Sequence, residues 1–277
     1  MKYIECKFTL ANYPIFYEVL IALLSELQFE SFQEEEPHLY AYIEESAFDE
    51  KLLLNQISAY SKIHLVHAKE MEQINWNEEW EKNYQPLSVD DFCYIRAPFH
   101  DSVEGYTHEL VIEPKMSFGT GHHATTRGMI RLLKQVEWKK GKVLDLGSGT
   151  GILAILASKM GAKSVIATDI EDWAYENMQE NFQRNHCREI MALKGSLPLK
   201  ELDNEQFDLL LANINKNVLL EQIQQYTELL DSGAKLFLSG FYSRDLKDIE
   251  IHCKTNQLFK VYETEESDWM AVAFERR

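Results

Sequence analysis

The sequence predicts an α/β protein in which a doubly wound, mostly parallel sheet follows a small α+β domain. Three observations predict this fold class. From residue 142 onward, short apolar strands alternate with helical stretches. A glycine-rich turn follows the first of those strands, whereas the first 70 residues mix short extended stretches with two helical ones. Regular strand and helix alternation is typical of a parallel sheet covered on both faces.

The composition indicates a globular chain whose negative charge is unevenly distributed. Its 277 residues are enough for two domains, and 45% of them are hydrophobic. The net charge is −17, and residues 1–90, with six lysines and seventeen carboxylates, account for −11 of it. Such a segment would repel a phosphate backbone and attract a basic polypeptide. A single acidic run such as residues 34–36 is more simply interpreted as solvated surface.

Membrane and disulfide signals are absent from the sequence. No run approaches the roughly 18 apolar residues that a membrane span needs, and the amino terminus has no long apolar signal core. The four cysteines lie far apart and form no CxxC pair, so neither a zinc site nor a disulfide framework is indicated. We therefore expect a cytoplasmic protein with reduced thiols and no membrane partner.

The first domain is expected over residues 1–70. Two helices on one small antiparallel sheet would give a ferredoxin-like unit, which we expect to recognise the substrate. The extended stretches are residues 2–10, 41–46 and 64–71, and the stretches with helical apolar spacing are residues 15–29 and 48–63.

A linker is predicted over residues 71–90. This stretch is polar and aromatic, contains Trp76, Trp80 and Pro86, and lacks a long apolar period. It could include a helix that crosses between the domains. Residues 91–277 then form the second domain, which begins with two further extended pieces, at 92–99 and 108–114.

The second domain continues with the strand and helix alternation. Gly161 marks the end of its first helix after the glycine turn. The tail, residues 258–277, is expected to be an antiparallel hairpin with an acidic turn. The expected strands are residues 142–147, 164–169, 207–213 and 235–240, and the expected helices are residues 151–161, 172–185 and 217–230.

The stretch VLDLGSGTG, residues 143–151, carries the strongest chemical signal. Asp145 lies at the end of the strand, and Gly147 and Gly149 lie in the turn into the helix. Glycines let the backbone approach a ligand, and the helix amino end offers unpaired N–H groups. Asp169 closes the next strand, where a carboxylate can accept both hydroxyls of a ribose. The pattern predicts a nucleoside cofactor.

Two cofactors compete for this turn. The window GTGILA, residues 149–154, satisfies the GxGxxG/A pattern of nicotinamide dinucleotide enzymes. However, that window starts late in the turn. The full string DxGxGxG is the pattern of methyltransferases that use S-adenosylmethionine, and an acid near the cationic end of that cofactor is favourable. We therefore favour the methyl donor over the dinucleotide.

Four segments, in this order and spacing, resemble the methyltransferases that modify large-subunit ribosomal protein eleven. The segments are MSFGTGHHATT (residues 116–126), VLDLGSGTGILAILASKMGA (143–162), ATDI (167–170) and LLANIN (210–215). Two further stretches are also similar, NWNEEWEKNYQPL (75–87) and LSG (238–240). The resemblance covers about residues 74 to 277, while the first 70 match in domain order more than in letters. It implies a class I methyltransferase with a seven-stranded sheet, S-adenosylmethionine as cofactor, and transfer to lysine or amino-terminal amines of that basic ribosomal protein.

The resemblance also implies site residues. Asp169 would hold the ribose, and Gly147 would let the methionine part approach the first turn. Thr126 would cap the helix over 125–136 while its hydroxyl stays near the cofactor. Phe118 and the glycines beside it would form a mobile lid. The full set of expected cofactor contacts is Thr126, Gly147, Asp169, Asn213, Asp145, Gly149 and Phe118.

His122 and His123 raise the question of a metal. Adjacent residues point in different directions on a strand or a helix, so the two rings cannot easily share one ion. We expect no metal there, and instead expect loop packing or hydrogen bonding to the cofactor or lid.

Asn213 is the expected catalytic residue. At the carboxyl end of its strand it could accept an N–H bond from an amine and aim the nitrogen lone pair, although a plain turn role remains an alternative. A free lysine has a pKa of about 10.4, so desolvation would help to remove its proton, and no general base is evident. The absence of an NPPY-type motif argues against glutamine or nucleic-acid base methylation.

Three departures from the family pattern bear on this interpretation. Ser148 stands where the family often has cysteine, and IEDW replaces the more usual Asp-Pro turn after Asp169. After Asn213 the chain has Ile214, Asn215, Lys216 and Asn217, and that lysine could repel a lysine substrate or point to solvent.

Two alternative functions stay open: a small-molecule methyltransferase whose first domain is a lid, and a catalytically silent ribosome-associated factor that binds the cofactor. The sequence gives no indication of the oligomeric state.

Overall fold

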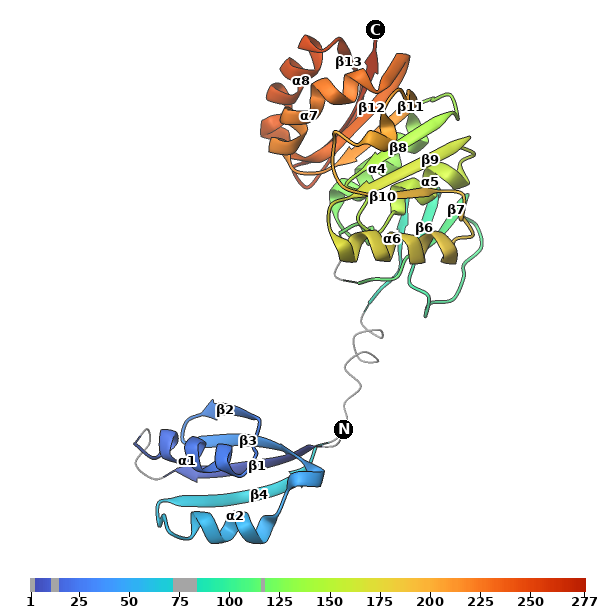
Figure 1. Ribbon diagram of the computed structural model, residues 1–277. Helices are drawn as coiled ribbons and strands as arrows, with labels where there is room; N and C mark the ends of the chain where they lie inside the picture. The colour runs from blue at the N-terminus through green and yellow to red at the C-terminus, as the bar shows by residue number, and fades with distance from the viewer. Residues whose placement is uncertain (1–2, 11–14, 72–83, 116–117) are drawn as a thin grey trace. The chain divides into compact units, whose positions relative to one another are not determined.

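The computed structural model describes residues 3–10, 15–71, 84–115 and 118–277 (Figure 1). It divides the chain into two units, Met1–Trp80 and Glu81–Arg277, each with its own hydrophobic core. The linker predicted over residues 71–90, including any crossing helix, falls mostly outside the described residues. Within its described end, Leu87–Val89 form a strand that sequence reasoning assigned to the linker.

The first unit has the predicted ferredoxin-like topology. Its four strands form one antiparallel sheet in the order β2-β3-β1-β4. The elements are β1 (Tyr3–Leu10), α1 (Ile15–Glu26), β2 (Ser31–Glu35), β3 (His38–Glu44), α2 (Glu50–Ile57) and β4 (Ile63–Glu70).

Alternation along β1 explains how this unit folds. Every second residue is buried, namely Ile4, Cys6, Phe8 and Leu10, and these side chains belong to the unit's core. Strand β2 was missed because it is an exposed, polar edge strand without an apolar pattern. The acidic run at residues 34–36 is solvated, as predicted, but its first two residues also belong to β2.

The second unit contains a seven-stranded sheet in the order β10-β9-β8-β11-β12-β14-β13. All neighbouring pairs up to β12 are parallel, and β14 is antiparallel to both of its neighbours. The elements are β8 (Lys142–Leu146), α5 (Ile152–Lys159), β9 (Ser164–Asp169), α6 (Asp172–Arg184), β10 (Met191–Lys194), β11 (Phe207–Asn213), α7 (Lys216–Glu228), β12 (Leu230–Tyr242), α8 (Leu246–Thr255), β13 (Leu258–Glu266) and β14 (Trp269–Arg276).

Helices cover both faces of this sheet, as the alternating pattern predicts (Figure 1). Helices α5 and α6, together with α4 (Ala124–Gln135), contribute to one core, and α7 and α8 contribute to another on the opposite face. The predicted acidic hairpin is also confirmed, because β13 and β14 pair antiparallel and Ser267 and Asp268 form the turn between them. Strand β10 and helix α8 were not identified from the sequence.

A separate three-stranded sheet precedes the large one. It contains β5 (Leu87–Val89), β6 (Cys93–Arg96) and β7 (His108–Val111) in the order β5-β6-β7. Two buried asparagines, Asn181 in α6 and Asn185 directly after it, hold the end of β7 and the residues that follow. Asn185 Oδ1 accepts from Val111 N–H and Asn181 Oδ1 accepts from Glu113 N–H, each at 2.9 Å. No helix among the described residues is long and apolar enough to cross a membrane.

Candidate active site

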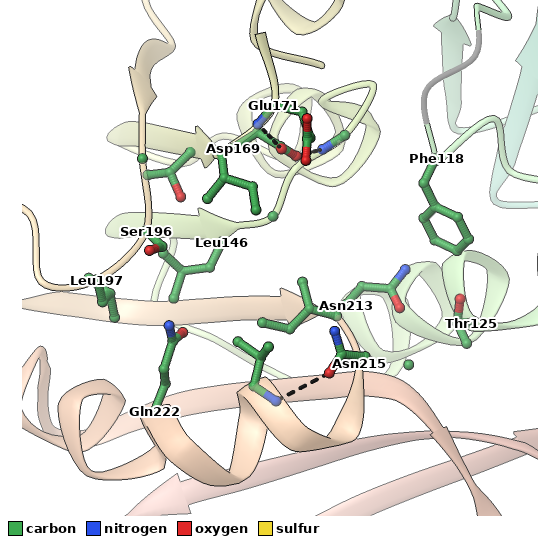
Figure 2. Close-up of a pocket in the computed structure, with 18 of the residues that line it drawn as sticks. Phe118, Thr125, Leu146, Asp169, Glu171, Ser196, Leu197, Asn213, Asn215 and Gln222 are labelled. Atoms are coloured by element: carbon green, nitrogen blue, oxygen red, sulfur yellow. Dashed lines mark hydrogen bonds between the residues drawn. The ribbon is translucent and has the colours of Figure 1, made fainter. Parts of the chain in front are cut away.

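A cavity of about 660 Å³ lies where the strands of the large sheet end (Figure 2). Sites for small molecules usually occupy such an edge and have volumes of this order. At one end, Ser196 and Leu197 follow β10; at the other, the Asn213 amide lies on the same side as Phe118 and Thr125. The cavity is therefore elongated enough to hold a ligand with two distinct parts.

The glycine turn after β8 forms part of the cavity wall. Gly147 and Gly149 have φ of +66° and +55°, a backbone region that other residues rarely adopt. A Cβ at Gly147 would lie 2.4 Å from Ile214 Cγ2, and one at Gly149 would lie 2.2 Å from the Phe118 carbonyl oxygen. Glycine is thus required both by the conformation and by the close approach of neighbouring segments.

Asp169, at the end of β9, lines the cavity with its carboxylate held in place. Its Oδ2 accepts from Gly149 N–H at 2.8 Å, and its Oδ1 accepts from Glu171 N–H at 3.1 Å. Each carboxylate oxygen can accept a second hydrogen bond. The carboxylate is therefore oriented by the glycine turn and keeps acceptor capacity for two donors from a ligand.

Thr150 links the loop of residues 118–123, which we call the FGTGHH loop, to the glycine turn. Its N–H donates to the Phe118 carbonyl at 2.9 Å, and its hydroxyl donates to the Gly119 carbonyl at 2.6 Å. The Phe118 ring lines the cavity and is 49% exposed. The lid role of Phe118 stays a prediction, but the backbone at this point is attached to the turn beneath it.

The two adjacent histidines of this loop, His122 and His123, contact different parts of the structure. His122 Nε2 lies 3.0 Å from the Gln85 carbonyl, and its Nδ1 lies 3.3 Å from the Tyr84 hydroxyl. His123 instead caps α4, because its Nδ1 accepts from Thr125 N–H at 3.3 Å. In the described part of the chain, no group of three or more His, Cys, Asp or Glu side chains is placed to hold a metal ion.

Two expected cofactor contacts lie behind the cavity wall. Thr126 does not cap α4, because the helix begins at Ala124 and His123 takes the capping position. Thr126 is buried in the first turn, and its neighbour Thr125 lines the cavity in its place. Asp145 is also buried, and its Oδ2 accepts from Ala154 N–H at 3.1 Å. The five other expected contacts, Phe118, Gly147, Gly149, Asp169 and Asn213, all line the cavity.

Asn213 ends β11 with an unused acceptor. Asn213 lines the cavity, and its buried Oδ1 has no hydrogen-bond partner among the described residues. A buried polar atom without a partner is costly, so a ligand donor at this position is favoured. The side chain is thus placed to accept a hydrogen bond from whatever enters this end.

The unusual residues after Asn213 have structural roles. Asn215 caps α7 by accepting from Val218 N–H at 3.2 Å. Lys216 makes ion pairs with Asp245 and Asp248 at 2.8 and 2.7 Å and does not line the cavity. The question left open by the sequence is therefore answered: Lys216 is paired away from the ligand space.

The electrostatics of the cavity favour a cation. Asp169, Glu171 and Glu221 line it, and none of the described lining residues is lysine or arginine. Below the glycine turn, burial raises the pKa of Asp145 to about 7. A pyrophosphate would face carboxylates without a compensating cation, whereas a sulfonium or ammonium would be attracted.

Sequence reasoning missed several lining residues. Ile170 and Trp173 follow Asp169 and are 61% and 47% exposed, and Trp269 begins β14 far along the chain. Exposed apolar side chains directly after a strand-ending acid were an available signal for Ile170 and Trp173. No sequence pattern pointed to Trp269, because only the sheet order brings β14 beside β12.

A cluster of charges supports the loop and the hairpin around the cavity. The Arg127 guanidinium donates to the carbonyls of Gly121 and His122 and forms an ion pair with Glu266. Arg131 pairs with the other oxygen of Glu266. Hydrogen bonding and charge from these two arginines lower the pKa of the Glu266 carboxyl. The carboxylate therefore joins α4 to the end of β13.

Comparison with known proteins gives a consistent family. A model of the family described as ribosomal protein L11 methyltransferase (PrmA) matches residues 17–277. The match extends further into the first unit than the resemblance seen in the sequence. Proteins named ribosomal protein L11 methyltransferase from Phocaeicola vulgatus and Porphyromonas gingivalis are 40% and 41% identical, over 99% of this chain and 99% and 98% of their own lengths.

A solved structure is similar to this chain and has the same family description. The ribosomal protein L11 methylase of Lactobacillus delbrueckii subsp. bulgaricus is 30% identical, with a TM-score of 0.65, over 70% of this chain and all of that one. A methyltransferase from Pyrococcus furiosus, at 18% identity and a TM-score of 0.50, shares the fold over 60% of this chain.

The steric requirement at Gly149 can be tested by substitution. Gly149→Ala should lower the free energy of unfolding by about 2 kcal/mol more than Gly233→Ala, because only the first adds a clash to the strained backbone. Gly233 is a matched control, with φ of +79° and nothing within 4 Å of an added Cβ. Chemical denaturation of both variants measures the difference, and equal losses would contradict the close approach of Phe118.

The Glu266 cluster predicts a pH dependence. Because the folded pKa of Glu266 is lowered, its stabilisation is present above the unfolded carboxyl pKa of about 4.3 and is lost as the pH falls through the folded value. Glu266→Gln should therefore cost on the order of 1 kcal/mol at pH 7 and progressively less towards pH 3. Thermal unfolding across this range tests it. Glu263→Gln, which removes a more exposed partner of Lys260, should show little effect at either pH.

Proposed function

This chain belongs to the ribosomal protein L11 methyltransferase family, and from that premise we propose that it transfers methyl groups from S-adenosylmethionine to amines of ribosomal protein L11. The accepting groups are lysine side chains, the amino-terminal amine, or both. We also propose that the reaction takes place in the cytoplasm, where ribosomal proteins are made. The observation that carries the proposal is the acidic cavity in which a held carboxylate and an unpartnered amide oxygen lie on the walls.

The cavity fits S-adenosylmethionine on three grounds. Its glycine turn leaves room that a Cβ would fill, its ribose candidate Asp169 retains acceptor capacity, and its lining carboxylates suit a cation. When bound, this cofactor supplies a methyl group on a positively charged sulfur. Asp169 would hold the ribose, the backbone at Gly147 and Gly149 would receive the methionine part, and Ile170 and Leu197 offer apolar side chains for the base.

Nicotinamide dinucleotide fits less well. Its pyrophosphate requires N–H groups and is penalised by neighbouring carboxylates. The described lining residues include three carboxylates and no lysine or arginine. The glycine spacing that left both cofactors possible is therefore resolved by charge in favour of the methyl donor.

Asn213 is proposed to orient the acceptor amine. Its buried Oδ1 can accept one N–H bond, which fixes the direction of the nitrogen lone pair. The acceptor ammonium would first lose one proton to water; its nitrogen then would form an N–C bond as the S–C bond of the sulfonium breaks, which leaves a neutral thioether. Removal of water from around the amine, together with a nearby positive sulfur, lowers the ammonium pKa from about 10.4 and makes this loss easier. Alignment and desolvation thus replace a dedicated base.

The first unit is proposed to recognise the protein substrate. Residues 1–70 carry five lysines and twelve carboxylates, a net charge of −7, which would attract a basic polypeptide. The same charge would repel ribosomal RNA, so we infer that the enzyme meets the protein and does not bind RNA directly.

Removal of the proposed ribose ligand tests the cofactor assignment. Asp169→Ala should weaken S-adenosylmethionine binding at least about tenfold, because it removes the ribose acceptor and the bond that orients Gly149. Calorimetric titration gives the affinity. Asp172→Ala is the control, since that exposed carboxylate is only paired with Lys194 and should leave the affinity unchanged. An unaltered affinity in Asp169→Ala would contradict the assignment.

The substrate assignment is tested with purified ribosomal protein L11 and a labelled methyl donor. The full chain should label L11, whereas residues 71–277 should keep the cofactor affinity and lose most of the labelling. Label on small molecules alone, or no label with intact cofactor binding, would refute the proposed substrate. Full labelling by the shortened chain would refute the docking role of residues 1–70.

A further inference from the structure

Three aromatic rings line the end of the cavity that holds the Asn213 amide. Phe118 and His123 have ring centroids 5.2 Å apart, and those of His123 and Trp269 are 4.8 Å apart. All three side chains line the cavity. Trp269 also packs against Tyr242, with their ring centroids 4.0 Å apart. We call Phe118, His123 and Trp269 the aromatic wall.

The aromatic wall is uncharged at neutral pH. His123 Nδ1 accepts from the N–H of Thr125 at 3.3 Å and lies 2.8 Å from the Thr125 hydroxyl oxygen. Burial, and to a lesser degree the charge of Arg127, lowers the pKa of this histidine. A protonated ring here would repel a cationic ligand, whereas a neutral ring does not.

The wall is held from two sides by Arg127. Its guanidinium binds the backbone carbonyls of Gly121 and His122, in the loop that carries Phe118 and His123. It also binds Glu266, which precedes the hairpin turn that leads to Trp269. Because Glu266 pairs with both Arg127 and Arg131, it compensates part of the positive charge that holds the loop next to the wall.

We propose that the aromatic wall binds the ammonium group of the acceptor side chain and prefers ammonium groups that already carry methyl groups. The inference rests on the proposed amine methyltransferase function. Aromatic faces attract cations through their quadrupole, and quaternary ammonium groups are well suited because they carry little hydration to lose. Asn213 Oδ1 meanwhile accepts from any N–H that remains. The wall and the amide oxygen together retain a partly methylated amine for another transfer.

The test uses binding, not turnover. The full chain, saturated with S-adenosylhomocysteine, is titrated calorimetrically with a short peptide containing trimethyllysine. The same peptide with a tert-butyl group in place of the trimethylammonium serves as an uncharged analogue of equal shape. The charged peptide should bind about threefold to thirtyfold more tightly, the range expected for a cation on aromatic faces. Equal affinities would overturn the proposal.

Substitutions locate the preference within the cavity. Trp269→Leu should reduce the ratio of the two affinities to near one, whereas Trp269→Phe should keep most of it. Trp173→Leu, which changes the exposed tryptophan near Asp169, should leave the ratio unchanged. Equal melting temperatures show that each variant is folded. A ratio that survives Trp269→Leu, or is lost in Trp173→Leu, would overturn the assignment to the wall.

These outcomes are separate from those of the proposed function. If ribosomal protein L11 is not labelled but the charged peptide is preferred, the substrate assignment fails and the aromatic wall stands. If L11 is labelled and the two peptides bind equally, the methyltransferase assignment stands and the aromatic wall fails.

Discussion

The two hydrogen bonds that Thr150 gives to the FGTGHH loop are the interaction on which the site depends. They attach the carbonyls of Phe118 and Gly119 to the glycine turn. The turn is in turn held by Asp169 through Gly149 N–H, so the loop, the turn and the proposed ribose ligand form one connected unit. This arrangement requires glycine at 149, because any Cβ would displace the Phe118 carbonyl. The glycines therefore bring two segments into contact as well as leaving space for a ligand.

Charge explains how the same cavity can attract both reactants. Carboxylates line it without a compensating lysine or arginine among the described residues, so a sulfonium and an ammonium are both drawn to it. Attraction alone would keep the amine protonated, which opposes transfer. Exclusion of water by the uncharged rings of the aromatic wall, and the positive sulfur of the cofactor, would act in the opposite direction and favour the neutral amine. The loop that carries two of these rings would thus contribute to specificity, and its role as a lid stays a prediction.

Most of the fold was predictable from the sequence, because the central strands of the large sheet are buried and form short apolar runs next to amphipathic helices. The exposed edge strand β2 and the short β10 lack such a pattern, and they were missed. At the site, Gly147, Gly149 and Asp169 were expected from the glycine turn and the strand end that carry them, and Asn213 from the family resemblance; all four line the cavity. Thr126 was expected to cap α4, but the cap lies three residues earlier, at His123. Trp269 depends on strand order, which no local pattern reveals.

The most direct test of the account is a crystal structure of the full chain with S-adenosylhomocysteine, with a parallel soak in nicotinamide adenine dinucleotide. The account predicts that the thioether compound occupies the cavity, with both ribose hydroxyls on the Asp169 carboxylate and its sulfur facing the Asn213 end. It predicts no dinucleotide there. A dinucleotide whose pyrophosphate lies on the glycine turn, or a thioether compound bound outside this cavity, would contradict it.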